Sequence, residues 1–214
     1  MDKFILDTNL FFNMGADLGL GDNTEKIITT ITEKILSLKK AGLAEFFMPP
    51  RAVDELLSFF ENKTQAFLKN FLSSITIKSP EVDGLSFPAA VFYKMVDDIR
   101  GRSLRGLNIG EEEIVASGRK MLGEEKNLSQ KDFQIKIGEA IKKFRERYRN
   151  ATRTGFLDSL TDLDIIVLAK EQGGFLVTTD EGVLAWGRAF GAKELPSPSF
   201  IRRLDDLASL RHQE

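Results

Sequence analysis

The chain has 214 residues, of which 42% are hydrophobic and 29% are charged, and its formal net charge is -2. This length fits one domain or one domain with a sizeable insertion, and the composition is that of a folded protein, not a disordered one. The absence of cysteine excludes disulfides, thiolate catalysis and zinc–sulfur sites, and the only histidine, His212, argues against a Ser-His-Asp triad or a histidine-rich metal site.

The N-terminal part of the chain predicts alternating strands and helices. A short apolar run that ends at Leu6 predicts a buried first strand, followed by a turn at Asp-Thr-Asn. Apolar residues spaced three or four apart predict an amphipathic helix over 24–41, which ends at Gly42. A second strand is expected over 45–48, then helices over roughly 50–61 and 63–73, and a short β-rich piece over 75–78.

Residues 88–153 have few strand signals, and we expect an all-helical protruding insertion there, with breaks near Gly101–Gly110 and Gly123–Ser129. The rest of the chain predicts helix 159–172, strand 175–178, helix 181–190, a short strand near 193–195 and a last helix from about Ser197. Strands that alternate with helices predict an α/β fold with a central parallel sheet flanked by helices. The expected boundaries are 1–87 and 154–214 for the sheet domain and 88–153 for the insertion.

Four aspartates stand where such a fold gathers functional groups. Asp7 and Asp180 directly follow predicted strands, and ligands of an open parallel sheet bind beyond the carboxyl ends of its strands. Asp158 and Asp162 lie four residues apart at the start of a helix, so both can face the same way. Carboxylates gathered in this way repel one another unless a divalent cation lies among them. Oxygen ligands without His or Cys favour Mg²⁺, with Mn²⁺ as an alternative.

Each of these aspartates also has a purely structural interpretation. Asp7 could cap the following turn, and Asp180 could be the N-cap of its helix. Asp158 and Asp162 could be favourable charges at a helix N-terminus. Taken together, the four aspartates favour a metal-dependent nuclease.

Two further acids have open roles. Asp164 lies off the helix face of Asp158 and Asp162, which favours a structural or supporting role. Glu55 follows the second predicted strand and is either an outer acid of the same site or a solvated helix charge.

Residues 131–153 predict a basic amphipathic helix, with eight basic and three acidic residues and therefore a local charge of +5. Ile137, Ile141, Phe144 and Tyr148 form an apolar stripe on it, and Lys142, Arg145, Arg149 and Arg153 form a second stripe beside the first. Arginine suits phosphate, and this helix leads directly to Asp158, so we expect the four cations to bind RNA. The alternative is a solvated charged face.

Several of these segments together resemble the PIN-domain nucleases. They are LDTN at 6–9, Glu55 on its helix, the run from Asp162 to Ala169, and GFLVTTD ending at Asp180. LDS-x-x-D-x-D at 157–164, TTDEGVLAW at 178–186, FRERYRNATRTGFLD at 144–158 and the long helical insertion are similar to the HARP family of small protein-only RNase P enzymes. The resemblance runs from Met1 to about Phe200.

This resemblance implies an enzyme that removes the 5′ leader from precursor tRNA without an RNA subunit. It implies a homo-oligomer, dodecameric in the family, assembled through the protruding helices, and it assigns the active-site acids to Asp7, Asp158, Asp162 and Asp180. The expected chemistry is hydrolysis in which one or two Mg²⁺ ions activate water, leaving a 5′-phosphate on the mature tRNA. Some relatives are labelled as RNA ligase partners, so a PIN nuclease with another RNA target and a non-catalytic RNA-binding scaffold are the alternatives.

The N-terminal MDKFILDTN has no basic segment and only a short apolar run, so it predicts no signal peptide. No stretch approaches the ~20 apolar residues that span a bilayer. We therefore expect a cytoplasmic protein without membrane association.

Overall fold

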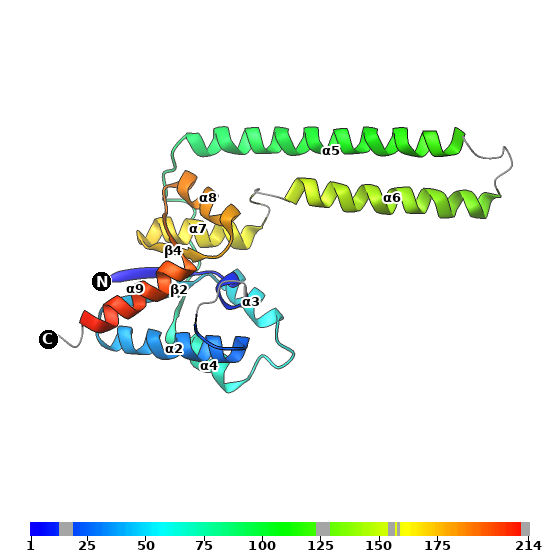
Figure 1. Cartoon of the computed structure of the whole chain (residues 1–214). Coiled ribbons are helices and arrows are strands. Elements are labelled where there is room, and N and C mark those ends of the chain that lie inside the picture. Colours follow the sequence, from blue (N-terminus) through cyan, green and yellow to red (C-terminus); the bar gives the residue numbers. More distant parts are fainter. Residues whose placement is uncertain (13–18, 123–128, 154–156, 158, 211–214) are drawn as a thin grey trace. The chain divides into compact units, whose positions relative to one another are not determined.

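The computed structural model describes residues 1–12, 19–122, 129–153, 157 and 159–210 (Figure 1). The side chains of Leu122, Arg153 and Leu210 are outside this description. The chain divides into two compact units. The first, called here the sheet unit, combines Met1–Pro88 with Leu157–Glu214, and the second, the hairpin unit, is Ala89–Phe156.

The sheet unit contains a five-stranded sheet in the order β3-β2-β1-β4-β5, in which every neighbouring pair is parallel. The strands are β1 (Asp2–Leu6), β2 (Ala44–Met48), β3 (Thr76–Ile77), β4 (Phe175–Thr178) and β5 (Lys193–Pro196). Phe4, Ile5 and Leu6 of the central strand are fully buried, as expected where helices cover both faces of a parallel sheet. The chain leaves β1 toward β2 and returns on its other side as β4, so the point where the strand order reverses lies between β1 and β4.

Helices pack on both faces of this sheet (Figure 1). One layer contains α2 (Thr24–Lys40), α4 (Ala66–Ser74) and α9 (Ser197–Leu210), and the other contains α3 (Pro50–Ser58), α7 (Leu160–Gln172) and α8 (Glu181–Phe190). In the core, the ring of Phe4 stacks on Phe46 and Phe175 and meets Phe200 edge-on. These layers confirm the predicted α/β fold with a central parallel sheet.

A one-turn helix, α1 (Asn9–Phe12), directly follows β1, where the sequence predicted only a turn. Four residues are too few to show a helical repeat of apolar side chains, and the Asp-Thr-Asn segment is equally typical of a turn. The α1 backbone is anchored by Asp7, whose carbonyl accepts a hydrogen bond from the Leu10 N–H at 3.3 Å.

The hairpin unit consists of α5 (Ala90–Leu122) and α6 (Gln130–Arg153), which pack along one another. The predicted break near Gly101–Gly110 is wrong, because α5 continues through these residues. A Cβ on Gly106 would lie 2.5 Å from the Tyr148 ring, so this glycine lets α6 approach closely, and the packing offsets its cost of about 1 kcal/mol in a helix. The second predicted break falls largely on 123–128, outside the described residues.

Among the helices described, none combines the length and the apolar character needed to cross a membrane.

Candidate active site

Asp7 lies directly after β1 and is buried, with 1% of its surface exposed. Its Oδ1 accepts hydrogen bonds from the Thr8 hydroxyl at 3.2 Å and the Asn9 backbone N–H at 3.4 Å. Its Oδ2 accepts from Asn9 Nδ2 at 3.2 Å and from the Thr178 hydroxyl. Burial raises the pKa of Asp7 above its ordinary value, although these donors oppose the rise. The carboxylate is therefore held in one orientation in a place where a nearby cation would stabilise its charge.

Thr178 connects Asp7 to Asp180. The pairing of β1 with β4 sets Leu6 opposite Val177, and the Asp7 N–H donates to the Val177 carbonyl at 3.0 Å. While its hydroxyl donates to Asp7, Thr178 Oγ1 accepts a hydrogen bond from the Asp180 N–H at 3.0 Å. The ends of two neighbouring parallel strands thus hold two of the predicted acids at one edge of the sheet.

Asp180 is the N-cap of α8, as its structural interpretation proposed. Its Oδ1 accepts hydrogen bonds from the backbone N–H groups of Gly182 at 2.7 Å and Val183 at 3.2 Å. The side chain is exposed, and within the described part of the chain its Oδ2 has no hydrogen-bond partner. Capping uses one oxygen, so it leaves the other available to a metal or a substrate.

The structure brings Glu55 of α3 to the same site. Partial burial raises its pKa, and the negative charge of Asp7 raises it further. The side chains of Thr8 and Thr161 lie near its carboxylate and lower its pKa, so Thr8, whose hydroxyl donates to Asp7, faces both acids. Glu55 is thus partly buried and lies near Asp7. The sequence did offer a signal, because Glu55 follows Ala52 by three residues and so flanks the buried face of α3.

Asp162 lies in the first turn of α7, next to Thr161. The N-cap of this helix is Ser159, whose hydroxyl accepts from the N–H groups of Thr161 at 3.1 Å and Asp162 at 3.4 Å. Because Thr161 lies near Glu55, the first turn of α7 is close to the acid pair of Asp7 and Glu55. Asp158 lies outside the described residues.

Asp164 is a buried acid of α7 that forms an ion pair with α3. Its Oδ2 lies 2.6 Å from Nη1 of Arg51 on α3. Arg51 and Glu55 are one turn apart on α3, while their partners Asp164 and Thr161 are one turn apart on α7 in the opposite order. The two helices therefore run antiparallel and are joined by two polar contacts, which agrees with the supporting role expected for Asp164.

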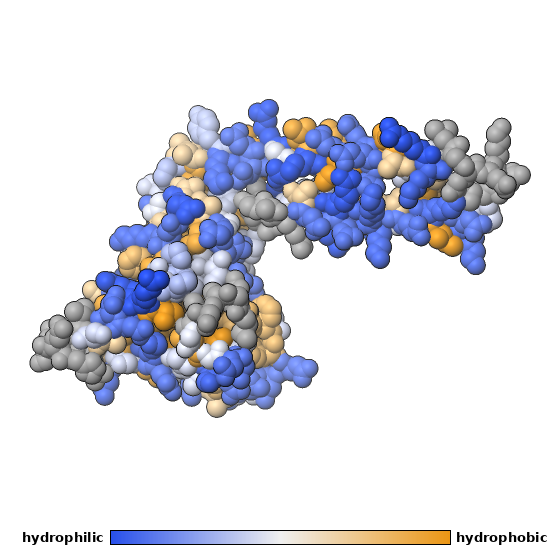
Figure 2. Space-filling model, viewed as in Figure 1, coloured by the Kyte–Doolittle hydropathy of each residue, from blue (hydrophilic) through white to orange (hydrophobic). Residues whose placement is uncertain are grey.

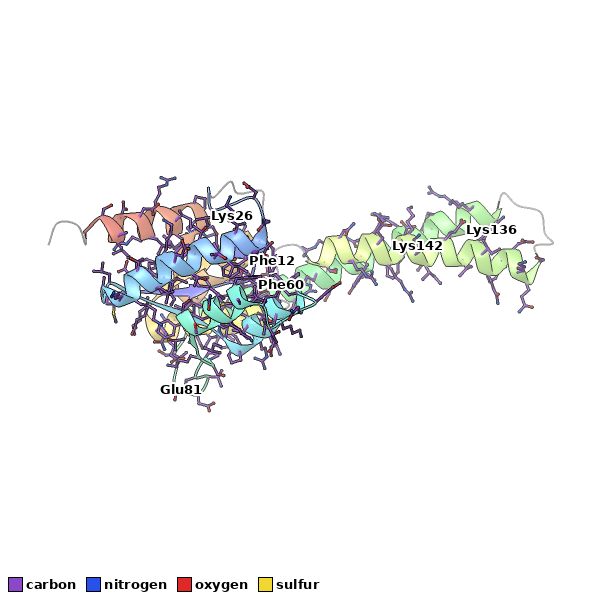
Figure 3. All side chains as sticks on the ribbon, turned by 90° about the horizontal axis from the view of Figure 1, so that it is seen from below. Phe12, Lys26, Phe60, Glu81, Lys136 and Lys142 are labelled. Carbon is purple, nitrogen blue, oxygen red and sulfur yellow. The ribbon has the colours of Figure 1, made fainter. Side chains whose placement is uncertain are left out.

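Three of the four cations predicted to bind RNA are exposed on α6. Lys142, Arg145 and Arg149 line one shallow depression along this helix, and within the described chain none of them forms an ion pair (Figure 3 labels Lys142). Arg153 ends the helix, and its side chain is outside the described residues.

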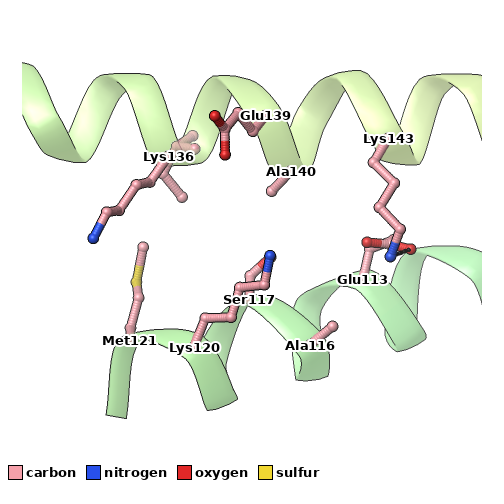
Figure 4. Close-up of a pocket in the computed structure, with 10 residues that line it drawn as sticks. Glu113, Ala116, Ser117, Lys120, Met121, Lys136, Glu139, Ala140 and Lys143 are labelled. Carbon is pink, nitrogen blue, oxygen red and sulfur yellow. Dashed lines mark ion pairs between the residues drawn. The ribbon is translucent and has the colours of Figure 1, made fainter. Parts of the chain in front are cut away.

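Neighbouring cations on α6 have a different role, because they join the two helices of the hairpin. Lys143 Nζ lies 3.0 Å from Glu113 of α5, and Arg147 pairs with Glu113 at 2.7 Å and with Glu112 at 2.5 Å. The hydrogen bond with Arg147, followed by that with Lys143, lowers the pKa of Glu113. Figure 4 shows Glu113 and Lys143 beside a pocket of about 370 Å³ between α5 and α6. Asp7, Asp162 and Asp180, the predicted acids that the structure describes, do not line this pocket.

Comparison with known proteins agrees with this geometry. The profile of the PINc domain ribonuclease family matches residues 3–209. An RNA-free ribonuclease P from Pyrococcus abyssi is 32% identical over 207 residues, covering 97% of this chain and 93% of that protein. The chain belongs to this family of RNA-free ribonuclease P.

Other members of the RNA-free ribonuclease P family match over a similar length. The protein from Thermodesulfovibrio yellowstonii is 33% identical and covers 92% of this chain and 91% of its own length. The protein from Hyperthermus butylicus is 34% identical, with coverage of 99% and 90%. These matches include the hairpin unit as well as the sheet unit, so they confirm the resemblance to HARP and PIN nucleases found in the sequence.

The donor set of the site suits a hard divalent cation. Among the described residues, which do not include Asp158, no three His, Cys, Asp or Glu side chains lie close enough to hold a metal by themselves. Mg²⁺ usually keeps several waters and binds through one or two carboxylates together with substrate phosphates, so it needs no complete protein cage. The buried carboxylate of Asp7, coupled to Glu55, therefore fits such an ion.

Proposed function

We propose that this ribonuclease removes the 5′ leader from precursor tRNA by hydrolysing one phosphodiester, without an RNA subunit. The observation that carries the proposal is the acid edge of the sheet, where Thr178 joins Asp7 to Asp180 and Glu55 is coupled to Asp7. The names and coverage of the relatives support the substrate.

Mg²⁺, or Mn²⁺ in its place, is the cofactor we propose. Asp7, Asp158, Asp162 and Asp180 would hold it, with Glu55 as an outer acid. When bound, the ion supplies a Lewis acid that activates water and offsets negative charge on the phosphodiester. The groups described at this edge that can transfer protons are carboxylates, together with water.

The chain's own groups orient this chemistry. Thr178, Thr8 and Asn9 fix the direction of the Asp7 oxygens by donating hydrogen bonds to them. Asp180 is fixed by the two backbone N–H groups that it caps. Side chains held in this way need little rearrangement when the substrate binds, which is a main source of catalytic power.

The hairpin unit has two roles in this proposal. Lys142, Arg145 and Arg149, with Arg153, would contact RNA phosphates, which sets affinity and not sequence preference. Large apolar side chains of α5 are exposed, among them Tyr93 at 76% and Ile114 at 74%. Such exposure is typical of interfaces, and it supports the self-association, dodecameric by resemblance, expected from the sequence.

Cleavage of a precursor tRNA with a 5′ leader, in Mg²⁺ and in EDTA, tests the function. We expect wild type to make one cut at the mature 5′ end, only with metal, and Asp162→Asn to make none. Metal-dependent cutting at other positions would instead show a PIN nuclease with another RNA target. Tight RNA binding without any cutting by wild type would show a scaffold.

A further inference from the structure

Four phenylalanines form an aromatic patch on the sheet unit: Phe12, Phe59, Phe60 and Phe67. The ring centroids of Phe12 and Phe59 are 4.2 Å apart, those of Phe12 and Phe60 are 6.1 Å apart, and those of Phe60 and Phe67 are 5.7 Å apart. Figure 3 shows Phe12 and Phe60 close together, and Figure 2 shows a pale orange area where Figure 1 places α3. The rings come from α1, from the end of α3 and from α4.

The aromatic patch lies outside the core. Phe59 is 57% exposed, and Phe12, Phe60 and Phe67 are half-buried. Next to Phe12 and on α4, the rings of Phe11 and Phe71 are fully buried and meet edge-on at 5.1 Å. The core is therefore already filled by other rings. A single exposed phenylalanine needs no explanation, but a contiguous aromatic surface usually marks a binding site.

The aromatic patch is attached to the same elements as the acid pair. Phe12 ends α1, the one-turn helix that begins two residues after Asp7. Phe59 is the C-cap of α3 and lies one turn beyond Glu55. The aromatic patch therefore lies close in the chain to the acids that a substrate phosphate would reach. Short helical segments, α1 and the last turn of α3, thus connect the aromatic patch to Asp7 and Glu55.

The chemistry of these rings indicates which part of the RNA substrate they can bind. Phenylalanine has no donor or acceptor, so it recognises flat apolar faces, and the bases of an unpaired strand offer such faces regardless of sequence. Bases inside a duplex are already stacked and cannot use the patch. The exposed Lys63, between Phe60 and Phe67 in the chain, adds a cation for the backbone.

We propose that the aromatic patch stacks an unpaired base of the 5′ leader beside the phosphodiester that is cut. The proposal rests on the proposed function for the identity of the RNA. It adds a specificity for unpaired nucleotides on the leader side, which the acids alone do not supply.

The test is a cycle that changes protein and RNA separately. Binding is measured in EDTA for wild type, Phe59→Ala and Phe59→Trp. Each protein is tested with a precursor tRNA that has a normal leader and with one whose leader nucleotides are abasic. The dissociation constants give the coupling between the ring and the bases. Leu36→Ala is the matched control, because Leu36 is a 50% exposed apolar residue on α2.

We expect Phe59→Ala to weaken binding of the normal leader about tenfold, a typical effect of losing one base–aromatic stack. Phe59→Trp should bind as tightly as wild type. Abasic leaders should bind wild type and Phe59→Ala equally, and Leu36→Ala should behave as wild type throughout. Equal losses on both RNAs, or a change in the mass of the assembly on Phe59→Ala, would overturn the proposal.

The readout also separates this proposal from the proposed function. If wild type does not cut precursor tRNA, the proposed function is wrong. In that case, the same cycle with a single-stranded oligonucleotide and its abasic counterpart still tests whether the aromatic patch stacks bases. Coupling there would support stacking by the patch, and its absence would overturn it.

Discussion

Thr178 on β4 donates a hydrogen bond to Asp7 at the end of β1, across 171 positions of sequence. The same hydroxyl oxygen accepts the Asp180 N–H at 3.0 Å. A single buried hydroxyl therefore sets the orientation of one acid and the backbone position of another.

Thr178→Val should remove both hydrogen bonds while it preserves the volume of the side chain. We expect the free energy of unfolding to fall by about 1–3 kcal/mol, because a buried donor and a buried acceptor lose their partner. Cleavage should fall about 100-fold, since small misplacements of catalytic groups have effects of this size. Thr178→Ser, which retains the hydroxyl, should restore most of both. Unchanged cleavage by Thr178→Val would show that the orientation of Asp7 is not important.

Asp180 has a capping role that substitution can separate from its charge. Asparagine is as good an N-cap as aspartate, so Asp180→Asn should leave the melting temperature nearly unchanged while cleavage is lost. Asp180→Ala should lose cleavage and also about 1 kcal/mol of stability. Thermal unfolding and cleavage assays on both variants check this. Full activity in Asp180→Asn would remove Asp180 from the proposed metal ligands.

The Arg51–Asp164 ion pair should act as one unit. Arg51→Gln leaves a buried carboxylate without its partner, and we expect it to cost about 1–3 kcal/mol of stability, since Arg51 is itself half exposed. Asp164→Asn should cost less, and the double variant should cost less than the sum of the two. Urea unfolding of the four proteins measures this coupling. Additive losses would show that the pair does not join α3 to α7.

The contribution of Asp7 to the stability of the metal-free protein should fall as pH rises from acid toward neutral, whereas the lowered pKa values of Glu113 and Glu171 act in the opposite direction. The pKa of Asp7 is raised in the folded state from an ordinary value of 3.8, so the folded protein binds this proton more tightly than the unfolded chain does. The contribution of Asp7 to the free energy of unfolding therefore decreases with pH between these two values, and Glu55 acts in the same direction.

Denaturant unfolding in EDTA at a series of pH values from 4 to 8 (roughly the range in which such carboxyls titrate) measures this effect. Asp7→Asn, which cannot ionise, should show a smaller decrease and should be more stable than wild type at neutral pH. Mg²⁺ should stabilise wild type at neutral pH, and Asp7→Asn less. The same pH dependence of stability in wild type and in Asp7→Asn would contradict the raised pKa of Asp7.

Two groups of cations on α6 should have different effects on RNA binding. The double variant Arg145→Gln/Arg149→Gln should weaken RNA binding and lower the slope of log affinity against log salt by about 2, because each phosphate contact contributes roughly 0.7–0.9. Arg147→Gln is the control, since Arg147 pairs with Glu112 and Glu113 and should affect stability of the hairpin unit instead. Equal salt slopes for wild type and the double variant would show that these arginines do not contact phosphate.

The sequence predicted those features that depend on local pattern. The strand ends at Leu6 and Thr178 were visible because an apolar run stops at an acid or a hydroxyl, and parallel pairing then brings the two ends together. The N-cap role of Asp180 was also visible, since capping involves only the next three residues. Features that depend on packing between distant elements were not visible in this way.

Glu55 illustrates the difference. Its coupling to Asp7 depends on how α3 packs beside β1 and α7, which spacing within α3 does not determine. The glycines of α5 are a second example, because Gly106 is a helix breaker in isolation and a contact surface once Tyr148 packs on it. Arg51 is a third, since its partner Asp164 lies 113 residues away.

The order of the strands has a consequence for the protein during its synthesis. Asp7 leaves the ribosome well before its partner on β4, because Thr178 follows it by 171 positions of sequence. A nascent chain that lacks β4 has neither Asp180 nor the Thr178 hydroxyl that orients Asp7, and β1 then has an open edge. We therefore expect a nascent chain to have no cleavage activity until β4 and Asp180 have been synthesised.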